Sequence, residues 1–355
     1  MAKNISLTGD EMLLVRADAN AAMGMGHVMR CLALGQYWRR AGGRVQFVGN
    51  IDDNSIQKRL RQSGFEFVFL KTHHPDPRDL EKTLQILNRC RSDVSWTVVD
   101  GYHLGPEYQK TLRTSGNRLL VWDDYNHHKS YCADMILNQN LGAENILYTT
   151  EQPTVKLLGK DYIVLRREFL DKSQPGGGDT DSFRLLITFG GADPENATSK
   201  VVQALHRLDI HPMEIAVVIG ANNPNAAAVR KSCDSLGRHL VRVVKDPYMP
   251  AMMSWADIAI SSSGTTAWEL MYMGVPTLLI VLAENQKEIA EGLHQRHAAW
   301  NIGDIHAIVP DTIADSVKRL RDETGLRHEM SLTASRLVDG RGAERVIQAM
   351  MGSGQ

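Results

Sequence analysis

Short apolar runs alternate with stretches of helical periodicity along most of this chain. A helix is predicted from His27 to Arg40 because apolar positions recur there at intervals of three or four, and two glycines follow it. Strands are predicted around it at residues 12–18, 44–49, 65–70, 96–100 and 118–123. Because strands that alternate with helices form parallel, doubly wound sheets, the pattern predicts an α/β fold.

The same alternation starts again after a segment that reads as a linker. Residues 171–181 carry a proline, three glycines and polar side chains, which give this segment no means of burying apolar surface. We therefore predict an N-terminal Rossmann-like domain at residues 1–170 and a C-terminal one at residues 182–355. Their sheets are expected to face a cleft, where the carboxyl ends of the strands bind ligands. Beyond the linker we predict strands at 183–189, 214–219, 256–260 and 276–282, and helices at 198–208, 265–273 and 342–351.

The charge balance and the cysteines exclude several classes of protein. The 355 residues carry a formal net charge of -1, so no overall field attracts nucleic acid or an anionic membrane. The four cysteines are far apart, with neither a disulfide framework nor zinc-site spacing. The chain shows no signal peptide and no run of roughly 18 apolar residues. We expect a cytoplasmic protein, monomeric or weakly oligomeric, with no nucleic acid or membrane partner.

Two turns in the second half are suited to binding phosphate. Gly190 and Gly191 follow a predicted strand, where glycine allows backbone amides to approach a phosphate closely. The run 261–266 (Ser-Ser-Ser-Gly-Thr-Thr) precedes a helix whose N-terminal N–H groups suit a diphosphate. Either turn could instead be an ordinary strand-to-helix corner. We expect Ser263, Gly264 and Thr265 to bind the diphosphate, and Glu269, one turn along the helix, to bind ribose hydroxyls unless it is only a solvated helix residue.

His27 is the candidate catalytic residue of the first half. It opens a helix behind the loop Gly24-Met25-Gly26, where the positive helix end disfavours protonation of the imidazole. A neutral histidine beside a phosphorylated leaving group can deprotonate water. The alternative is a histidine that caps or packs the start of the helix.

Polar residues after other predicted strands suit a sugar or a metal. Tyr102 follows one strand of the first half, and Asn285 and Gln286 follow a strand of the second half. Their side chains could bond sugar hydroxyls or N-acetyl groups, or could belong to packing and turns. Carboxylates and imidazoles in Asp123-Asp124 and His127-His128 could ligate a metal ion. We expect no metal there, because polar loops of this composition are common.

An ordered set of motifs runs along the chain. It opens with Arg-Ala-Asp-Ala and Gly-Met-Gly-His-Val-Met-Arg-Cys-Leu, and includes Ile-Thr-Phe-Gly-Gly-Ala-Asp-Pro and Ser-Ser-Gly-Thr-Thr-Ala-Trp-Glu. The set resembles the PseG family of UDP-2,4-diacetamido-2,4,6-trideoxy-β-L-altropyranose hydrolases. The motifs lie, in order, at residues 16–19, 24–32, 122–124, 137–140, 159–169, 187–194, 262–269, 274–276 and 284–286. The resemblance implies a GT-B-like fold similar to that of MurG, with UDP held mainly by the C-terminal domain.

The same resemblance implies roles for individual residues in pseudaminic acid biosynthesis. It implies that His27, with Gly26 before it, activates water without metal or cofactor, that UDP leaves with inversion, and that the backbone at Tyr248 and Met249 meets uracil. One residue departs from the pattern. The family places a histidine before the tyrosine of the first-domain loop, where this chain has Gly101. Either His103 substitutes from a shifted position or that contact is absent.

Two other functions remain open from the sequence. A glycosyltransferase would use the same base on a hydroxyl acceptor, and an acceptor in a membrane would favour an apolar and basic patch on the first domain. A nucleotide-sugar-binding protein without catalysis would bind UDP but release no sugar. The presence of His27 argues against the second of these.

Overall fold

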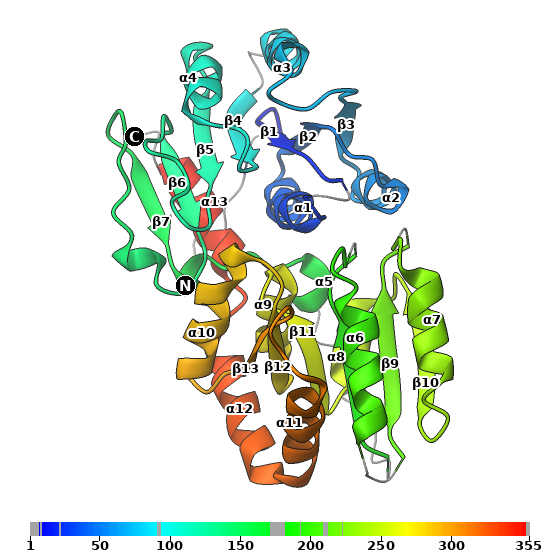
Figure 1. The fold of residues 1–355 in the computed structure, drawn as a ribbon. Helices are drawn as coiled ribbons and strands as arrows, with labels where there is room; N and C mark the ends of the chain where they lie inside the picture. The colour runs from blue at the N-terminus through cyan, green and yellow to red at the C-terminus, as the bar shows by residue number, and fades with distance from the viewer. Residues whose placement is uncertain are drawn as a thin grey trace. The chain divides into compact units, whose positions relative to one another are not determined.

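The computed structural model describes residues 7, 9–20, 23–90, 94–170, 182–191, 193–208, 212–221 and 223–352 (Figure 1). The predicted linker at residues 171–181 lies outside these residues. The chain forms two compact units: Met1–Arg167 together with Gly340–Gln355, and Glu168–Asp339. Each unit is built around one parallel β-sheet.

The sheet of the first unit has seven strands in the order β3-β2-β1-β4-β5-β6-β7, and every neighbouring pair is parallel. The order reverses next to β1, because β2 and β3 extend the sheet in one direction and β4 to β7 in the other. The strands are β1 (Met12–Ala17), β2 (Arg44–Gly49), β3 (Glu66–Phe69), β4 (Val94–Asp100), β5 (Arg118–Trp122), β6 (Met135–Asn138) and β7 (Val155–Leu158).

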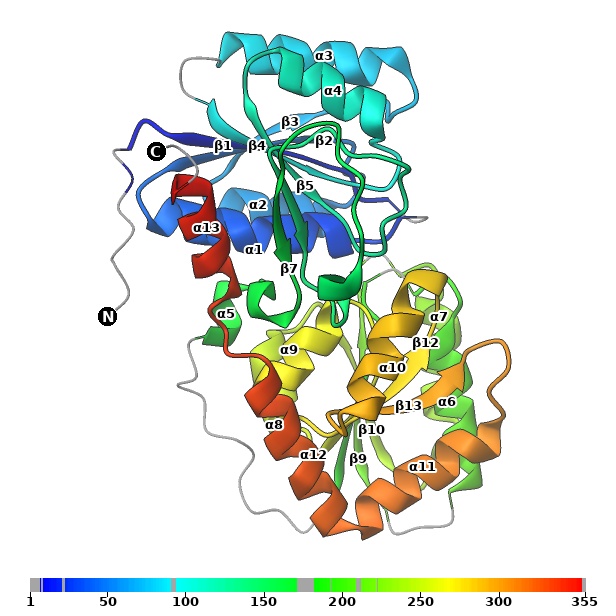
Figure 2. The same ribbon diagram turned by 90° about the vertical axis from the view of Figure 1, so that its left-hand side faces the viewer.

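Helices cover both faces of this sheet. Helices α1 (Gly26–Arg40) and α2 (Asn54–Gln62) lie on one face, and α3 (Pro77–Arg89) and α4 (Pro106–Thr114) lie on the other (Figure 2). Successive side chains along each strand point to opposite faces of the sheet, and they form one apolar core on each face. Leu13 and Val15 pack with α1, whereas the alternate residues of β1 pack with α3 and α4. This double burial explains why the strands read as continuous apolar runs.

The last helix, α13 (Gly342–Gly352), belongs to the first unit, whereas the sequence assigned it to the C-terminal domain. Its apolar face, with Val346 and Ile347 fully buried, joins the core beneath α1. The indole Nε1 of Trp96 donates a hydrogen bond of 3.1 Å to the carbonyl of Met350. Position 342 must be glycine, because a Cβ there would lie 2.1 Å from a backbone oxygen of the same unit. The prediction assigned α13 by its position at the end of the chain. Only the fold shows which of the two cores the apolar face of α13 packs against.

The sheet of the second unit repeats the topology of the first, with six parallel strands in the order β10-β9-β8-β11-β12-β13. They are β8 (Arg184–Thr188), β9 (Glu214–Ile219), β10 (Leu240–Lys245), β11 (Ile258–Ser262), β12 (Thr277–Val281) and β13 (Trp300–Asp304). Three short elements also occur here: α5 (Arg167–Leu170) and the 3₁₀ turns Leu205–Arg207 and Glu284–Gln286. The helices are α6 (Ala197–Ala204), α7 (Ala226–Asp234), α8 (Met249–Trp255), α9 (Thr265–Met273), α10 (Lys287–Gln295), α11 (Pro310–Asp322) and α12 (Thr324–Leu337).

Each sheet therefore has a point where the direction of strand addition reverses, between β1 and β4 in the first unit and between β8 and β11 in the second. Ligands of open α/β sheets bind outside the carboxyl ends of the strands at such a point. The predicted pair of doubly wound Rossmann-like domains is confirmed. None of the described helices is long and apolar enough to cross a bilayer.

Candidate active site

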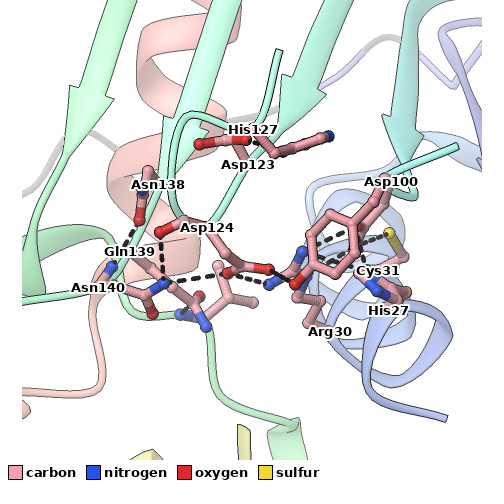
Figure 3. Close-up of polar contacts among 12 residues, drawn as sticks. His27, Arg30, Cys31, Asp100, Asp123, Asp124, His127, Asn138, Gln139 and Asn140 are labelled. Atoms are coloured by element: carbon pink, nitrogen blue, oxygen red, sulfur yellow. Dashed lines mark hydrogen bonds and ion pairs between the residues drawn. The ribbon is translucent and has the colours of Figure 1, made fainter. Parts of the chain in front are cut away.

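The reversal point of the first sheet places a carboxyl group against His27. Asp100 is the last residue of β4, and its side chain is fully buried. The Nδ1 atom of His27, in the first turn of α1, lies 2.6 Å from Oδ1 of Asp100 (Figure 3). Because β1 leads into α1 and pairs with β4, the fold brings together two residues that are 73 positions apart in sequence.

Arg30 fixes the same carboxylate from one helical turn further along α1. Its Nε and one terminal nitrogen each donate a hydrogen bond of 2.7 Å to Asp100, one to each oxygen. Its other terminal nitrogen donates to Asp124 over 2.7 Å. The guanidinium carbon lies 4.9 Å from the ring centroid of Trp122, which covers one face of the group. These contacts hold Asp100 in one orientation.

Charge determines which nitrogen of His27 carries the proton. Burial alone would raise the pKa of Asp100, but the charges of Arg30 and then His27 hold it well below its usual range. An ionised carboxylate only accepts hydrogen bonds, so Nδ1 of His27 donates to it. The Nε2 atom of a neutral His27 is then an acceptor, as a general base requires.

Tyr102 stands beside this pair, but its hydroxyl is engaged within the protein. It donates a hydrogen bond of 2.6 Å to Oδ2 of Asp124. The ring of Tyr102 packs edge-on against His27, with centroids 4.8 Å apart. Burial would raise the pKa of Asp124, but the charge of Arg30 lowers it overall. A contact of Tyr102 with a sugar, as the sequence predicts, would therefore involve its ring or its hydroxyl oxygen as an acceptor.

The possible metal ligands after β5 bond to other protein groups. Asp124 binds Arg30 and Tyr102, as described above, whereas Asp123 accepts hydrogen bonds from Tyr131 at 2.8 Å and Tyr148 at 2.6 Å. Nδ1 of His127 lies 2.6 Å from Oδ1 of Asp123. Within the described ranges no group of three histidine, cysteine or acidic side chains is placed to hold a metal ion.

His103 occupies space next to the unusual Gly101. A Cβ added to Gly101 would lie 2.8 Å from a ring carbon of His103, so this imidazole stands where a side chain at position 101 would begin. Its Nε2 lies 2.7 Å from Asp18, which also pairs with the buried Arg16. The structure therefore places His103 beside the position of the missing family histidine.

The reversal point of the second sheet carries the predicted diphosphate residues. Ser263 and Gly264 form the short turn between β11 and α9, and Thr265 is the first residue of that helix. The hydroxyl of Ser263 donates a hydrogen bond of 2.9 Å to the backbone oxygen of Gln286. The N-cap residue of α9 is Gly264, which supplies no side-chain cap to this end of the helix. Its first N–H groups and the positive end of its dipole are suited to an anion.

The neighbouring glycine turn is different, because a side chain already caps its helix. Gly190 has φ +79°, a left-handed conformation that favours glycine, and Gly191 approaches the backbone after β9 closely. The buried carboxylate of Asp193 accepts hydrogen bonds from the backbone N–H groups of Ala197 at 2.8 Å and Thr198 at 3.0 Å. Part of the N-terminus of α6 is therefore occupied by the protein itself.

The remaining predicted ligands of the second unit differ in their surroundings. Glu269 is buried in α9, which excludes the interpretation as a solvated helix residue. Oε1 of Gln286 accepts a hydrogen bond of 3.1 Å from the backbone of Leu282, so this side chain fixes the turn after β12. Asn285 lies in the same 3₁₀ turn, and Met249 is the first residue of α8.

Comparison with protein families adds a classification for the second unit. Residues 185–345 match the C-terminal domain of glycosyltransferase family 28. The matched region begins in β8 and includes the uncapped α9 and the turn at Glu284–Gln286.

Three relatives resemble the chain at low identity. An uncharacterized protein of Methanocaldococcus jannaschii is 26% identical over 291 residues, which cover 78% of this chain and 57% of that protein. This chain thus spans little more than half the length of that relative. The spore coat polysaccharide biosynthesis protein SpsG of Bacillus subtilis is 24% identical over 334 residues, 93% of this chain and 95% of SpsG. A UDP-2,4-diacetamido-2,4,6-trideoxy-β-L-altropyranose hydrolase of Campylobacter jejuni is 20% identical over 288 residues, 80% of this chain and 96% of the hydrolase.

Solved structures share the architecture of the whole chain. Acinetobacter baumannii MurG superposes with a TM-score of 0.66 at 16% identity and covers 96% of this chain and 99% of its own. The MnaA–UDP co-structure of S. aureus superposes with a TM-score of 0.68 at 13% identity and covers 97% and 96%. The chain has a GT-B-like fold. This GT-B-like architecture occurs in proteins of different names, so the reaction must be argued from the site residues.

Sequence analysis singled out His27 but missed the two side chains that position it. A signal was present for each. Asp100 is a lone carboxylate at the end of an apolar strand, and Arg30 follows His27 by three residues, on the same face of the helix. The sequence alone does not show that β1 pairs with β4, and this pairing makes the three residues neighbours.

Proposed function

We propose that this protein hydrolyses a UDP-activated amino sugar at the anomeric carbon and releases UDP and the free sugar. The observation that carries the catalytic part is the contact between His27 and the ionised Asp100 at the reversal point of the first sheet. A buried carboxylate that fixes the proton on Nδ1 leaves Nε2 to take a proton from water.

In the proposed reaction, Nε2 of His27 removes a proton from a water molecule as its oxygen bonds to the anomeric carbon. The bond between that carbon and the diphosphate oxygen breaks, the electron pair leaves with UDP, and the configuration inverts. The positive charge that develops on the imidazole is stabilised by Asp100, which Arg30 holds in place. Because a diphosphate leaves as a stable anion, this step needs no strong general acid.

The second unit is proposed to bind the nucleotide. The uncapped N-terminus of α9 offers backbone N–H groups at Gly264 and Thr265 to the diphosphate. Glu269, one turn further, is proposed to accept hydrogen bonds from the ribose hydroxyls. The match of residues 185–345 to the C-terminal domain of glycosyltransferase family 28 supports a nucleotide-sugar ligand for this unit.

The sugar is proposed to be a 2,4-diacetamido-2,4,6-trideoxy hexose. The name of the C. jejuni relative, which this chain resembles over 96% of the relative's length, supports this choice. The motifs shared with the PseG family, in particular the loop before His27, support it as well. No metal or cofactor is part of the proposal.

The test uses the purified protein with UDP-2,4-diacetamido-2,4,6-trideoxy-β-L-altropyranose and no acceptor. We expect UDP and free sugar in equal amounts by mass spectrometry, with the same rate in the presence of a chelator. The variant His27→Ala should lower kcat by a factor on the order of 10². Intact substrate after prolonged incubation would refute hydrolysis of this sugar, and near-normal turnover by His27→Ala would refute the role of His27.

A second candidate is an inverting glycosyltransferase, which the family 28 match itself favours. Its base would remove a proton from a sugar hydroxyl instead of from water, so the site chemistry would be the same. The two functions separate in one experiment. Addition of cell extract as a source of acceptor would transfer the sugar to a larger product in the second case and leave the yield of free sugar unchanged in the first.

A further inference from the structure

A second imidazole, that of His127, packs against Tyr102 as the catalytic His27 does. Tyr102 packs edge-on against His27 with centroids 4.8 Å apart, and edge-on against His127 with centroids 4.9 Å apart. His127 approaches Asp123, which directly follows β5, much as His27 approaches Asp100 at the end of β4 (Figure 3). Neighbouring strands thus each present a carboxyl group with a histidine at the same edge of the sheet.

The imidazole of His127 is buried, and its ring nitrogens form no regular hydrogen bond with the described residues. Its side chain exposes only 10% of its surface. Although Nδ1 lies 2.6 Å from Asp123, the pair is too poorly aligned for a regular hydrogen bond, and Nε2 has no hydrogen-bond partner among the described residues. A buried polar group without a hydrogen bond lowers the stability of the folded protein. A ligand that supplied the missing hydrogen bond would remove this cost.

The carboxyl group of Asp123 is held in place independently of His127. Tyr131 and Tyr148 donate hydrogen bonds to it, and so does the backbone N–H of Asn126 at 2.6 Å. Burial would raise the pKa of Asp123, but the close contact with His127, and then the hydrogen bonds from Tyr148, Asn126 and Tyr131, lower it to about 2. Asp123 thus remains an anion that attracts the N–H of His127, whichever way the ring turns.

An exposed aromatic side chain borders the same site. The ring of Tyr125 lies 5.2 Å from that of Tyr102 and 5.3 Å from that of His127, and 43% of its surface is exposed. An exposed aromatic face beside a buried hydrogen-bonding group is suited to a ligand with one apolar face and polar substituents at its edge. A pyranose ring has this chemistry.

We propose that His127 binds the sugar of the substrate, by a hydrogen bond between its imidazole and a hydroxyl or N-acylamino group on the pyranose ring. The ligand class rests on the proposed function. A role as general acid is not needed, because the diphosphate leaves without a proton. His127 is therefore a specificity residue, distinct from the base His27, and the aromatic side chains of Tyr102 and Tyr125 form the walls around it.

The test measures binding in a protein that cannot turn over its ligand. In the His27→Ala background, calorimetry gives Kd for UDP, UDP-glucose and UDP-N-acetylglucosamine. We expect His127→Phe, which keeps a ring but no hydrogen-bonding nitrogen, to weaken binding of the UDP-sugars by roughly 3- to 10-fold and to leave Kd for UDP unchanged. A loss confined to UDP-N-acetylglucosamine identifies the N-acyl group as the partner, and an equal loss for both sugars identifies a hydroxyl group. His127→Gln, which retains a polar end, should restore part of the affinity.

His239 offers a matched control in the second unit. It is also buried, its Nδ1 accepts a hydrogen bond of 3.2 Å from the backbone of Met213, and its Nε2 has no partner within the described residues. His239→Phe should leave the preference for UDP-sugars over UDP intact.

The inference is wrong if His127→Phe, with a melting temperature near that of its parent, keeps the same ratio of UDP-sugar to UDP affinity. It is also wrong if the parent protein binds UDP-sugars no more tightly than UDP, because no sugar contact then exists. Failure of the proposed function would give a different result. The protein with an intact His27 would not hydrolyse UDP-sugars, but His127→Phe would still weaken their binding.

Discussion

Replacement of Asp100 by asparagine tests whether this carboxylate makes His27 a base. The change keeps the shape of the side chain but removes its charge, and it offers an N–H group where Nδ1 of His27 now donates over 2.6 Å. An amide N–H facing Nδ1 would favour the tautomer with the proton on Nε2, which cannot accept a proton from water. We therefore expect kcat to fall, with little change in the affinity for UDP.

The size of the effect follows from the contact distance. Nitrogen and oxygen atoms 2.6 Å apart place the centres of the two charged groups about 4 Å apart, where the attraction is about 4 kcal/mol at an effective dielectric constant of about 20. Arg30 binds the same carboxylate and offsets part of its field. A remaining contribution of about 2–3 kcal/mol corresponds to a fall in kcat of roughly 10²-fold.

The assay combines steady-state UDP release with a double-mutant cycle. If Asp100 acts through His27, the double variant Asp100→Asn/His27→Ala should be no slower than His27→Ala alone. Asp124→Asn is the matched control, because it also removes a carboxylate from Arg30 but leaves the 2.6 Å contact of His27 in place. It should slow turnover less than Asp100→Asn.

Loss of folding is measured separately, since breaking a buried ion pair can cost about 3–5 kcal/mol. A folded Asp100→Asn protein, with a cooperative thermal transition, whose kcat stays within about threefold of wild type would refute the reasoning. A further 10²-fold loss in the double variant would refute it as well, because Asp100 would then act independently of His27.

Two further predictions concern stability and phosphate binding. Asp18 and Asp123 have pKa values lowered from 3.8 to about 2, because the contacts with His103 and His127, together with the other hydrogen bonds to each carboxylate, outweigh burial. Their stabilisation is therefore complete above about pH 4 and is lost toward pH 2. Urea unfolding should show this decline, and Asp123→Asn should make it shallower. Thr265→Glu, at the N-terminus of α9, should weaken UDP binding about tenfold in calorimetry. Asp193→Asn, at the capped N-terminus of α6, should cost only about 1 kcal/mol of stability. The opposite pattern would indicate that the phosphate binds at α6 and not at α9.

The fold could be predicted from the sequence because its strands are buried on both faces. Such strands are continuous apolar runs, and these marked most of the elements that order both sheets, as at β1 and β8. The missed strands β6 and β7 are only four residues long, and polar residues interrupt the apolar runs of β10 and β13 at the two edges of the second sheet. Neither pattern differs enough from a loop to be recognised locally.

The site was predictable only where one local segment determines it. The loop before His27 and the turn before α9 each combine glycine with a helix start, and both lie at a reversal point of a sheet. Contacts between distant segments could not be predicted in the same way. The roles of Asp100 and of Asp123 depend on the carboxyl ends of β4 and β5 lying side by side, which is a property of strand order.

The two reversal points also differ in charge, and this difference supports the proposed binding of the nucleotide by the second unit without reference to relatives. Around the first, five buried or nearly buried carboxyl groups outnumber the guanidinium groups of Arg16 and Arg30, so a diphosphate would be repelled there: Asp18, Asp79, Asp100, Asp123 and Asp124. Around the second, the turn at residues 263–265 presents hydroxyl and backbone N–H groups at the positive end of α9. The anionic part of a nucleotide sugar therefore suits the second unit, and the neutral sugar suits the first. Variants at His27 and Asp100 should accordingly change the rate of UDP release but not the Kd of UDP.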